Sequence, residues 1–353
     1  MDKIITLAKS LIAIPSVSNE TNELNKIFDL IKEELKGFEF REFKSEDITS
    51  LFYSNDLSKR QKLILNAHLD VVPGKKEQFV PVIKDNKIYG RGAYDMKSAA
   101  AVMIILFKEL SPRVDYPLGL QLVTDEEIGG LKGTKFQIEN GVDAEFVIAG
   151  ENTNLKINNL SKGIIWLKLK TRGKAAHGAY PWFGENAIWK MNKALSAIEK
   201  IFPELTKEQW VSTINLSNIE TSNKAFNKVP DECTASLDIR FIPEDGNKVI
   251  DKIKDRIKDF AELEITMQES SHKAAEDNDF INKLKISIKE VTGNHGETIA
   301  LHGASDMRFY TAKGIPAVTF GPRGGGHHSD SEWVDLKSLE DYYKILNTFL
   351  GSV

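Results

Sequence analysis

Three short apolar runs in this sequence each lead directly into histidine or carboxylate side chains. His68 and Asp70 follow the run at 62–67, Asp125-Glu126-Glu127 follows the run at 118–124, and Glu151 follows the run at 145–149. Short apolar runs of this kind are typical of buried strands. In open α/β sheets, ligands bind beyond the carboxyl ends of the strands. The pattern therefore predicts an α/β fold whose sheet has a substantial parallel part and carries a site at that edge.

The order of the remaining segments predicts two domains, which suits a chain of 353 residues. Helical spacing marks 96–110, 280–291 and 336–350, and a further buried strand is expected at 317–320. Between them lies a β-α-β-β-α-β series typical of a ferredoxin-like unit, with segments 163–172, 186–200, 211–221, 232–241, 247–260 and 262–268. We expect residues 1–160 and 270–353 to form one discontinuous domain, with 161–269 inserted.

Composition excludes several classes of protein. The chain has 47 basic and 51 acidic residues, so no charge excess favours nucleic acid or an anionic membrane. No run approaches 18 apolar residues, and the first residues lack the pattern of a signal peptide. Its single cysteine, Cys233, cannot form an internal disulfide. We expect a cytoplasmic protein with neither a nucleic-acid nor a membrane partner.

The chemistry-bearing residues each allow an ordinary structural interpretation as well as a functional one. Asp95 precedes an Ala-rich helix, where it can cap the helix or bridge metal ions. His327 and His328 follow three glycines in what can be a plain flexible connector. Imidazole and carboxylate groups are nevertheless suitable zinc ligands. No HExxH, phosphate-loop or GxSxG motif is present, which argues against a single-zinc protease, a nucleotide hydrolase and a serine hydrolase.

Taken together, these motifs resemble those of one metallopeptidase superfamily. The matching segments are His68-x-Asp70, Gly90-Arg91-Gly92, Asp95-Met96-Lys97, Asp125-Glu126-Glu127, Gly150-Glu151 and His328 through Glu332. The superfamily includes aminoacylase, acetylornithine deacetylase, succinyl-diaminopimelate desuccinylase and carboxypeptidase G. The resemblance implies a mixed sheet flanked by helices, of the di-zinc exopeptidase type, with an inserted α+β lid and dimerisation domain.

The resemblance also implies a site for two Zn²⁺ ions, with Co²⁺ or Mn²⁺ as possible substitutes. The implied ligands are His68, Asp95, Glu127, Glu151 and His328. Asp95 would bridge the ions, and the peptide bond after it is often cis in such proteins. Which zinc takes Glu127 and which takes Glu151 stays open. Metal ions of this kind lower the pKa of a bound water molecule to about 7.

The resemblance implies catalytic roles for three further residues. Glu126 would act as the general base, taking a proton from water and giving it to the leaving nitrogen. Asp70 would accept a hydrogen bond from the second ring nitrogen of His68 and fix its tautomer. His177 would stabilise the oxyanion, and in relatives this histidine can come from the partner subunit of a dimer.

The resemblance places a substrate-binding set at Tyr180, Asn227, Arg240, Gly303 and Arg308. The two arginines are candidates for gripping a substrate carboxylate. Where desuccinylases tend to carry an arginine pair, this chain reads Ser161-Lys162-Gly163, so one cation is missing. The expected activity is removal of an acyl group from an N-acyl amino acid by a homodimer. A dipeptidase or carboxypeptidase is the main alternative, and a metal-free binding protein is a remote one.

Overall fold

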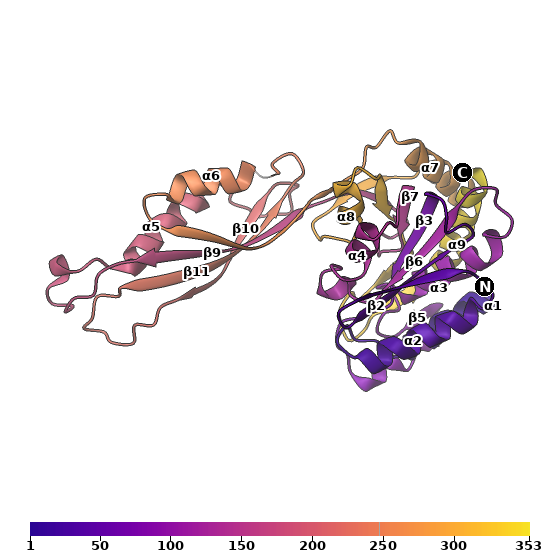
Figure 1. Cartoon of the computed structure of the whole chain (residues 1–353), viewed down its shortest axis with the longest axis horizontal. Coiled ribbons are helices and arrows are strands. Elements are labelled where there is room, and N and C mark those ends of the chain that lie inside the picture. Colours follow the sequence, from indigo (N-terminus) through magenta and orange to yellow (C-terminus); the bar gives the residue numbers. More distant parts are fainter. Residues whose placement is uncertain (247) are drawn as a thin grey trace. The chain divides into compact units, whose positions relative to one another are not determined.

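The computed structural model describes residues 1–246 and 248–353, which divide into two compact units (Figure 1). Unit 1 comprises residues 1–159, 273–299 and 305–353, and unit 2 comprises residues 160–272 and 300–304. The boundaries lie within a few residues of the expected ones, except that 300–304 groups with unit 2. In the described part of the chain, none of the helices has the length and apolar character needed to span a membrane.

The main sheet has nine strands in the order β1-β2-β6-β3-β7-β15-β8-β13, with β14 paired to β8. Strands β3, β6, β7 and β15 run parallel, and antiparallel strands flank them, so the predicted mixed sheet is confirmed. The strands are β1 (Phe40–Ser45), β2 (Ile48–Ser54), β3 (Gln61–His68), β6 (Leu118–Val123), β7 (Ala144–Ala149), β8 (Ile157–Ser161), β13 (His272–Lys273), β14 (Thr298–Leu301) and β15 (Ala317–Thr319).

Helices cover both faces of this sheet because its central strands are apolar on both sides. Successive residues of β7, such as Phe146 and Val147, point to opposite faces and belong to different buried clusters. The larger cluster lies under α1 (Asp2–Ile12), α2 (Thr21–Glu34), α3 (Lys97–Leu110), α7 (Asp279–Thr292) and α9 (Leu336–Ser352). The smaller cluster lies under α4 (Thr134–Glu139) and α8 (Met307–Ala312). Helix α3 is buried along almost its whole length, which explains its apolar, Ala-rich sequence.

Unit 2 has the predicted β-α-β-β-α-β order. Its sheet runs β10-β11-β9-β12, and all neighbouring pairs are antiparallel. Its core consists of the inward residues of β9 and β11 packed against two helices. The elements are β9 (Gly163–Arg172), α5 (Ala187–Glu199), β10 (Thr213–Glu220), β11 (Glu232–Phe241), α6 (Lys248–Ile257) and β12 (Glu262–Glu269). The predicted helix at 247–260 is therefore shorter, and its first residue lies outside the described residues.

A small third sheet belongs to unit 1 and joins two loops that are far apart in sequence. Its order is β16-β17-β5-β4, formed by β16 (Gly324–Gly325), β17 (Trp333–Asp335), β5 (Lys87–Tyr89) and β4 (Val82–Lys84). Trp333 pairs with Tyr89, and Val334 pairs with Ile88. This pairing brings the loop that carries His327 and His328 beside the segment that leads to Asp95.

Candidate metal centre

The parallel strands bring the predicted ligands to one edge of the sheet. In the register, His68 of β3 lies beside Val123 of β6, and Asn66 of β3 lies beside Ala149 of β7. The side chains that follow these strands therefore start from neighbouring points. Asp95 lies just before α3, and the peptide bond between Asp95 and Met96 is cis, as the resemblance implies.

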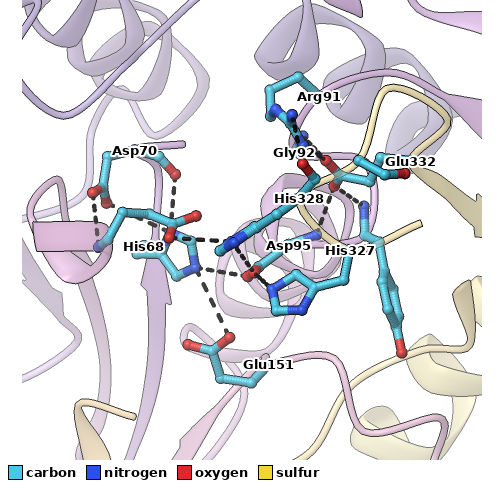
Figure 2. A network of polar contacts seen from close by, with 12 residues as sticks. His68, Asp70, Arg91, Gly92, Asp95, Glu151, His327, His328 and Glu332 are labelled. Atoms are coloured by element: carbon cyan, nitrogen blue, oxygen red, sulfur yellow. Dashed lines mark hydrogen bonds and ion pairs between the residues drawn. The ribbon is translucent and has the colours of Figure 1, made fainter. Parts of the chain in front are cut away.

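One group of ligands forms around the buried ring of His68 (Figure 2). Its Nε2 lies 3.0 Å from Asp95 Oδ1 and 3.9 Å from Glu151 Oε2. Ligand atoms of these three residues all lie within 4.8 Å of one another. Two carboxylates and an imidazole at such separations are a donor set that suits zinc.

A second group uses the other oxygen of Asp95. Asp95 Oδ2 lies 2.6 Å from His327 Nε2 and 3.4 Å from His328 Nε2. His328 Nε2 also lies 3.3 Å from Glu127 Oε2. Asp95 thus presents one oxygen to each group, which is the arrangement that a bridging carboxylate requires. Glu151 accompanies His68, whereas Glu127 accompanies His328.

Burial and the neighbouring ionisable groups shift the pKa values of these residues strongly. Burial raises the pKa of Glu151 to about 8, with Asp95 adding to the effect. Burial also raises the pKa of Asp95, but hydrogen bonds with His327, His328 and His68 outweigh it and hold that pKa well below its usual value. Burial lowers the pKa of His68, but Glu151, Asp70 and Asp95 together raise it well above its ordinary value. Carboxylates crowded in this way favour a bound cation.

The hydrogen bond between His68 and Asp70 uses the main-chain oxygen of Asp70 rather than its carboxylate. The His68 Nδ1 lies 3.0 Å from the main-chain oxygen of Asp70 and 3.5 Å from the Asp70 carboxylate. That carboxylate accepts hydrogen bonds from the backbone N–H groups of Glu126 and Glu127, at 3.3 and 3.1 Å, and from Ser18. Asp70 therefore ties the segment carrying Glu126 and Glu127 to the end of β3.

Glu126 begins the short 3₁₀ turn Glu126–Ile128, next to Glu127. Its carboxyl group belongs to neither of the two ligand groups formed by the described residues. Burial raises its pKa well above the ordinary value, and the nearby Glu151 raises it further. A partly buried carboxyl group beside a candidate metal site, with a raised pKa, is suited to moving a proton.

Unit 2 contains His177, Tyr180 and Asn227 in one locality. The isolated bridge His177↔Lys228 and the hydrogen bond from Gly178 N to Asn227 O, 2.6 Å, join the two segments. The rings of His177 and Tyr180 are 5.7 Å apart. Tyr180, Trp182 and Phe183 form an exposed aromatic group.

Arg240 of β11 lines a pocket of about 240 Å³ in unit 2, together with Lys162, Thr213 and His302. Arg240 Nε donates to Asp238 Oδ1 at 2.9 Å. Burial and the charge of Arg240 lower the pKa of Lys162. Gly303 follows His302 and has open space where a side chain would begin. The pocket is thus lined by three cationic side chains, Arg240, Lys162 and Lys207, and by the acidic Glu208.

Arg308 lies in unit 1, on α8, and is only 5% exposed. Its guanidinium donates to the carbonyl oxygens of Gly129, at 2.6 Å, and Ser305, at 2.9 Å. These bonds fix the end of the turn that carries Glu126. The side chain that was expected to grip a substrate carboxylate is thus occupied with backbone carbonyls.

Two residues near the centre were not among the predicted ligands. The Nε2 atom of His327 lies closer to Asp95 than that of His328 does. In the sequence, the only signal for this was that His327 is next to His328. Glu332 is 2% exposed and contacts the backbone around Asp95, a role that no spacing in the sequence indicates.

Comparison with known proteins agrees with this architecture. Over 374 residues, 99% of this chain and 98% of the other, the chain is 28% identical to a succinyl-diaminopimelate desuccinylase of Thioalkalivibrio sulfidiphilus. The M20 family metallo-carboxypeptidase Sso-CP2 of Sulfolobus solfataricus superposes with a TM-score of 0.78 at 20% identity, covering 99% of both chains. Aminopeptidase PepT of Bacillus cereus gives 0.80 at 19% identity, covering 99% of this chain and 97% of its own.

The sequence profile of one peptidase family matches residues 64–352, a span that contains every ligand of both groups. The chain belongs to peptidase family M20/M25/M40 and is a hydrolase that acts on amide or peptide bonds.

Proposed function

We propose that this protein removes the acyl group from an N-acyl amino acid in a zinc-dependent reaction. The observation that carries the proposal is the position of Asp95, which offers one oxygen to the His68 group and the other to the His328 group. The 28% identity to a desuccinylase over nearly the whole of both chains supports deacylation as the kind of amide hydrolysis.

One ion would be held by His68, Asp95 and Glu151. The other would be held by Asp95 and His328 together with Glu127, whose Oε2 lies 3.3 Å from His328 Nε2. Nitrogen and carboxylate oxygen donors suit zinc, and Co²⁺ or Mn²⁺ would be accepted by the same set. When bound, such ions polarise a carbonyl group and lower the pKa of water.

Glu126 would accept a proton from the attacking water and pass it to the leaving nitrogen. Desolvation raises the pKa of its partly buried carboxyl group above the ordinary value, which strengthens it as a proton acceptor. Its backbone N–H is held by Asp70, so the group is positioned before the substrate arrives.

His177 would donate a hydrogen bond to the developing oxyanion, with Tyr180 and Asn227 contacting the substrate beside it. Arg240 and Gly303 would receive the substrate carboxylate, because guanidinium binds carboxylate through two parallel hydrogen bonds. Lys162 and Lys207 line the same pocket as Arg240 and add positive charge there, which Glu208 offsets in part.

A dipeptidase or carboxypeptidase remains the second candidate, favoured by the similarity to the metallo-carboxypeptidase Sso-CP2. A panel of N-acetyl amino acids, N-succinyl amino acids and dipeptides, assayed with added Zn²⁺ or Co²⁺, separates the two. Deacylation of at least one N-acyl substrate well above any dipeptide supports the proposal. Dipeptide cleavage alone would replace it with the second candidate. Metal-free protein that hydrolyses nothing would instead indicate a binding protein.

We also propose a homodimer formed through unit 2. Support comes from the exposure of large apolar side chains there, such as Trp182, Phe183 and Trp189, and from the exposed edge strand β10. Light scattering at several concentrations tests it, since a monomer at all of them contradicts the proposal.

A further inference from the structure

A buried carboxylate outside the ligand set is bonded to the loop that carries Asp95. Glu332 Oε1 accepts hydrogen bonds from the backbone N–H groups of Tyr94, at 2.9 Å, and Asp95, at 3.1 Å. Glu332 Oε2 accepts from Gly92 N at 3.1 Å and from Arg91 Nη1 at 2.7 Å. Both carboxylate oxygens of Glu332 thus accept hydrogen bonds from the single stretch 91–95 (Figure 2).

Arg91 extends these contacts to two other loops of unit 1. Its Nη2 donates to the carbonyl oxygen of His328, at 3.3 Å, and to that of Pro73, at 3.4 Å. Pro73 lies shortly after β3, the strand that ends at His68. The Arg91–Glu332 pair therefore touches the chain segments that bear His68, Asp95 and His328, which are ligands of both groups.

The pair is electrically suited to this position. Both side chains are nearly inaccessible, at 4% and 1% exposed, and a lone buried carboxylate there would add repulsion to Asp95. Arg91 neutralises that charge, so Glu332 can hold the backbone without changing the net charge that the metal ions meet.

We propose that Glu332, held by Arg91, is a positioning residue that sets Asp95 and His328 in their metal-binding arrangement before metal arrives. The inference rests on the dinuclear site of the proposed function. Holding the ligands in advance removes the ordering cost from metal binding. Outer contacts of metal ligands typically contribute about 10- to 100-fold in metal affinity.

The test compares Glu332→Gln with a matched control, Asp335→Ala. Gln has the shape of Glu but keeps only one acceptor oxygen, so two of the four donors lose their acceptor. Asp335 lies three residues further along, in β17, but its carboxylate accepts from Ser338 N at 2.7 Å and caps α9. Asp335→Ala therefore lowers stability without releasing the Asp95 loop.

Metal-free samples of the wild-type chain and both variants are titrated with Zn²⁺ by calorimetry, and their Tm values are measured. Absorption spectra with Co²⁺ report the ligand geometry. We expect Glu332→Gln to bind Zn²⁺ about 10- to 100-fold more weakly, with an altered Co²⁺ spectrum, while Asp335→Ala keeps wild-type affinity.

Wild-type affinity and an unchanged Co²⁺ spectrum in Glu332→Gln would overturn the inference while leaving the proposed function in place. If the Zn²⁺ affinity fell in both variants in proportion to their loss of Tm, Glu332 would only stabilise the fold and would not position the ligands. A wild-type chain that binds no divalent metal overturns both proposals, whereas metal binding without hydrolysis of any panel substrate overturns only the function.

Discussion

Replacing Glu126 with Gln separates proton transfer from metal binding. The substitution keeps the size of the side chain, and the backbone N–H of residue 126 still donates to Asp70 Oδ1. Because Glu126 belongs to neither ligand group of the described residues, we expect two metal ions per chain to remain. Loss of a general base costs about 10²- to 10⁴-fold in kcat. At 1.36 kcal/mol for each tenfold, this is about 3 to 5 kcal/mol of activation free energy.

The assay measures kcat and KM on an N-acyl substrate beside elemental analysis of the same sample. Glu127→Gln is the matched control, because Glu127 lies next in the chain but contacts His328 at 3.3 Å. We expect that control to lose metal as well as turnover. If Glu126→Gln turned over at more than a tenth of the wild-type rate, or lost metal as Glu127→Gln does, the assignment of the base would be refuted.

Four other outcomes are expected. His68→Ala should lower the metal content measured by elemental analysis, and an unchanged stoichiometry would argue against its ligand role. His177→Ala should reduce kcat about 10²- to 10³-fold with metal content intact. A variant with the wild-type kcat would show that His177 has no catalytic role. Arg240→Met should raise KM about 10- to 100-fold for substrates with a free carboxylate, and equal KM values would contradict carboxylate binding. Removing metal with a chelator should lower the Tm, because one site with free metal at 1,000 times its Kd stabilises the fold by about 4.1 kcal/mol; an unchanged Tm would contradict a folded-state metal site.

The strand and helix pattern could be predicted because burial alternates or repeats along it. The run at 232–241 alternates between buried and more exposed residues, and β11 has those bounds. Strand β1 was missed because its two apolar residues, Phe40 and Phe43, lie three positions apart and do not alternate with polar residues. Strand β4 was missed because all of its residues are exposed.

The ligand set of the candidate centre could be proposed because its residues follow strands that share one edge. The contacts that support them could not, because they join side chains to backbone N–H and carbonyl groups far away in sequence. Glu332 binds the backbone at Asp95, and Arg308 binds the carbonyl of Gly129. A backbone group looks the same at every residue, so no sequence pattern marks such a partner.

The most direct measurement is anomalous diffraction at the zinc absorption edge from a crystal grown with Zn²⁺. The account predicts two anomalous peaks per chain, one bound by His68, Asp95 and Glu151 and the other by Asp95, Glu127 and His328. A single peak, or two peaks that do not share Asp95, would contradict it.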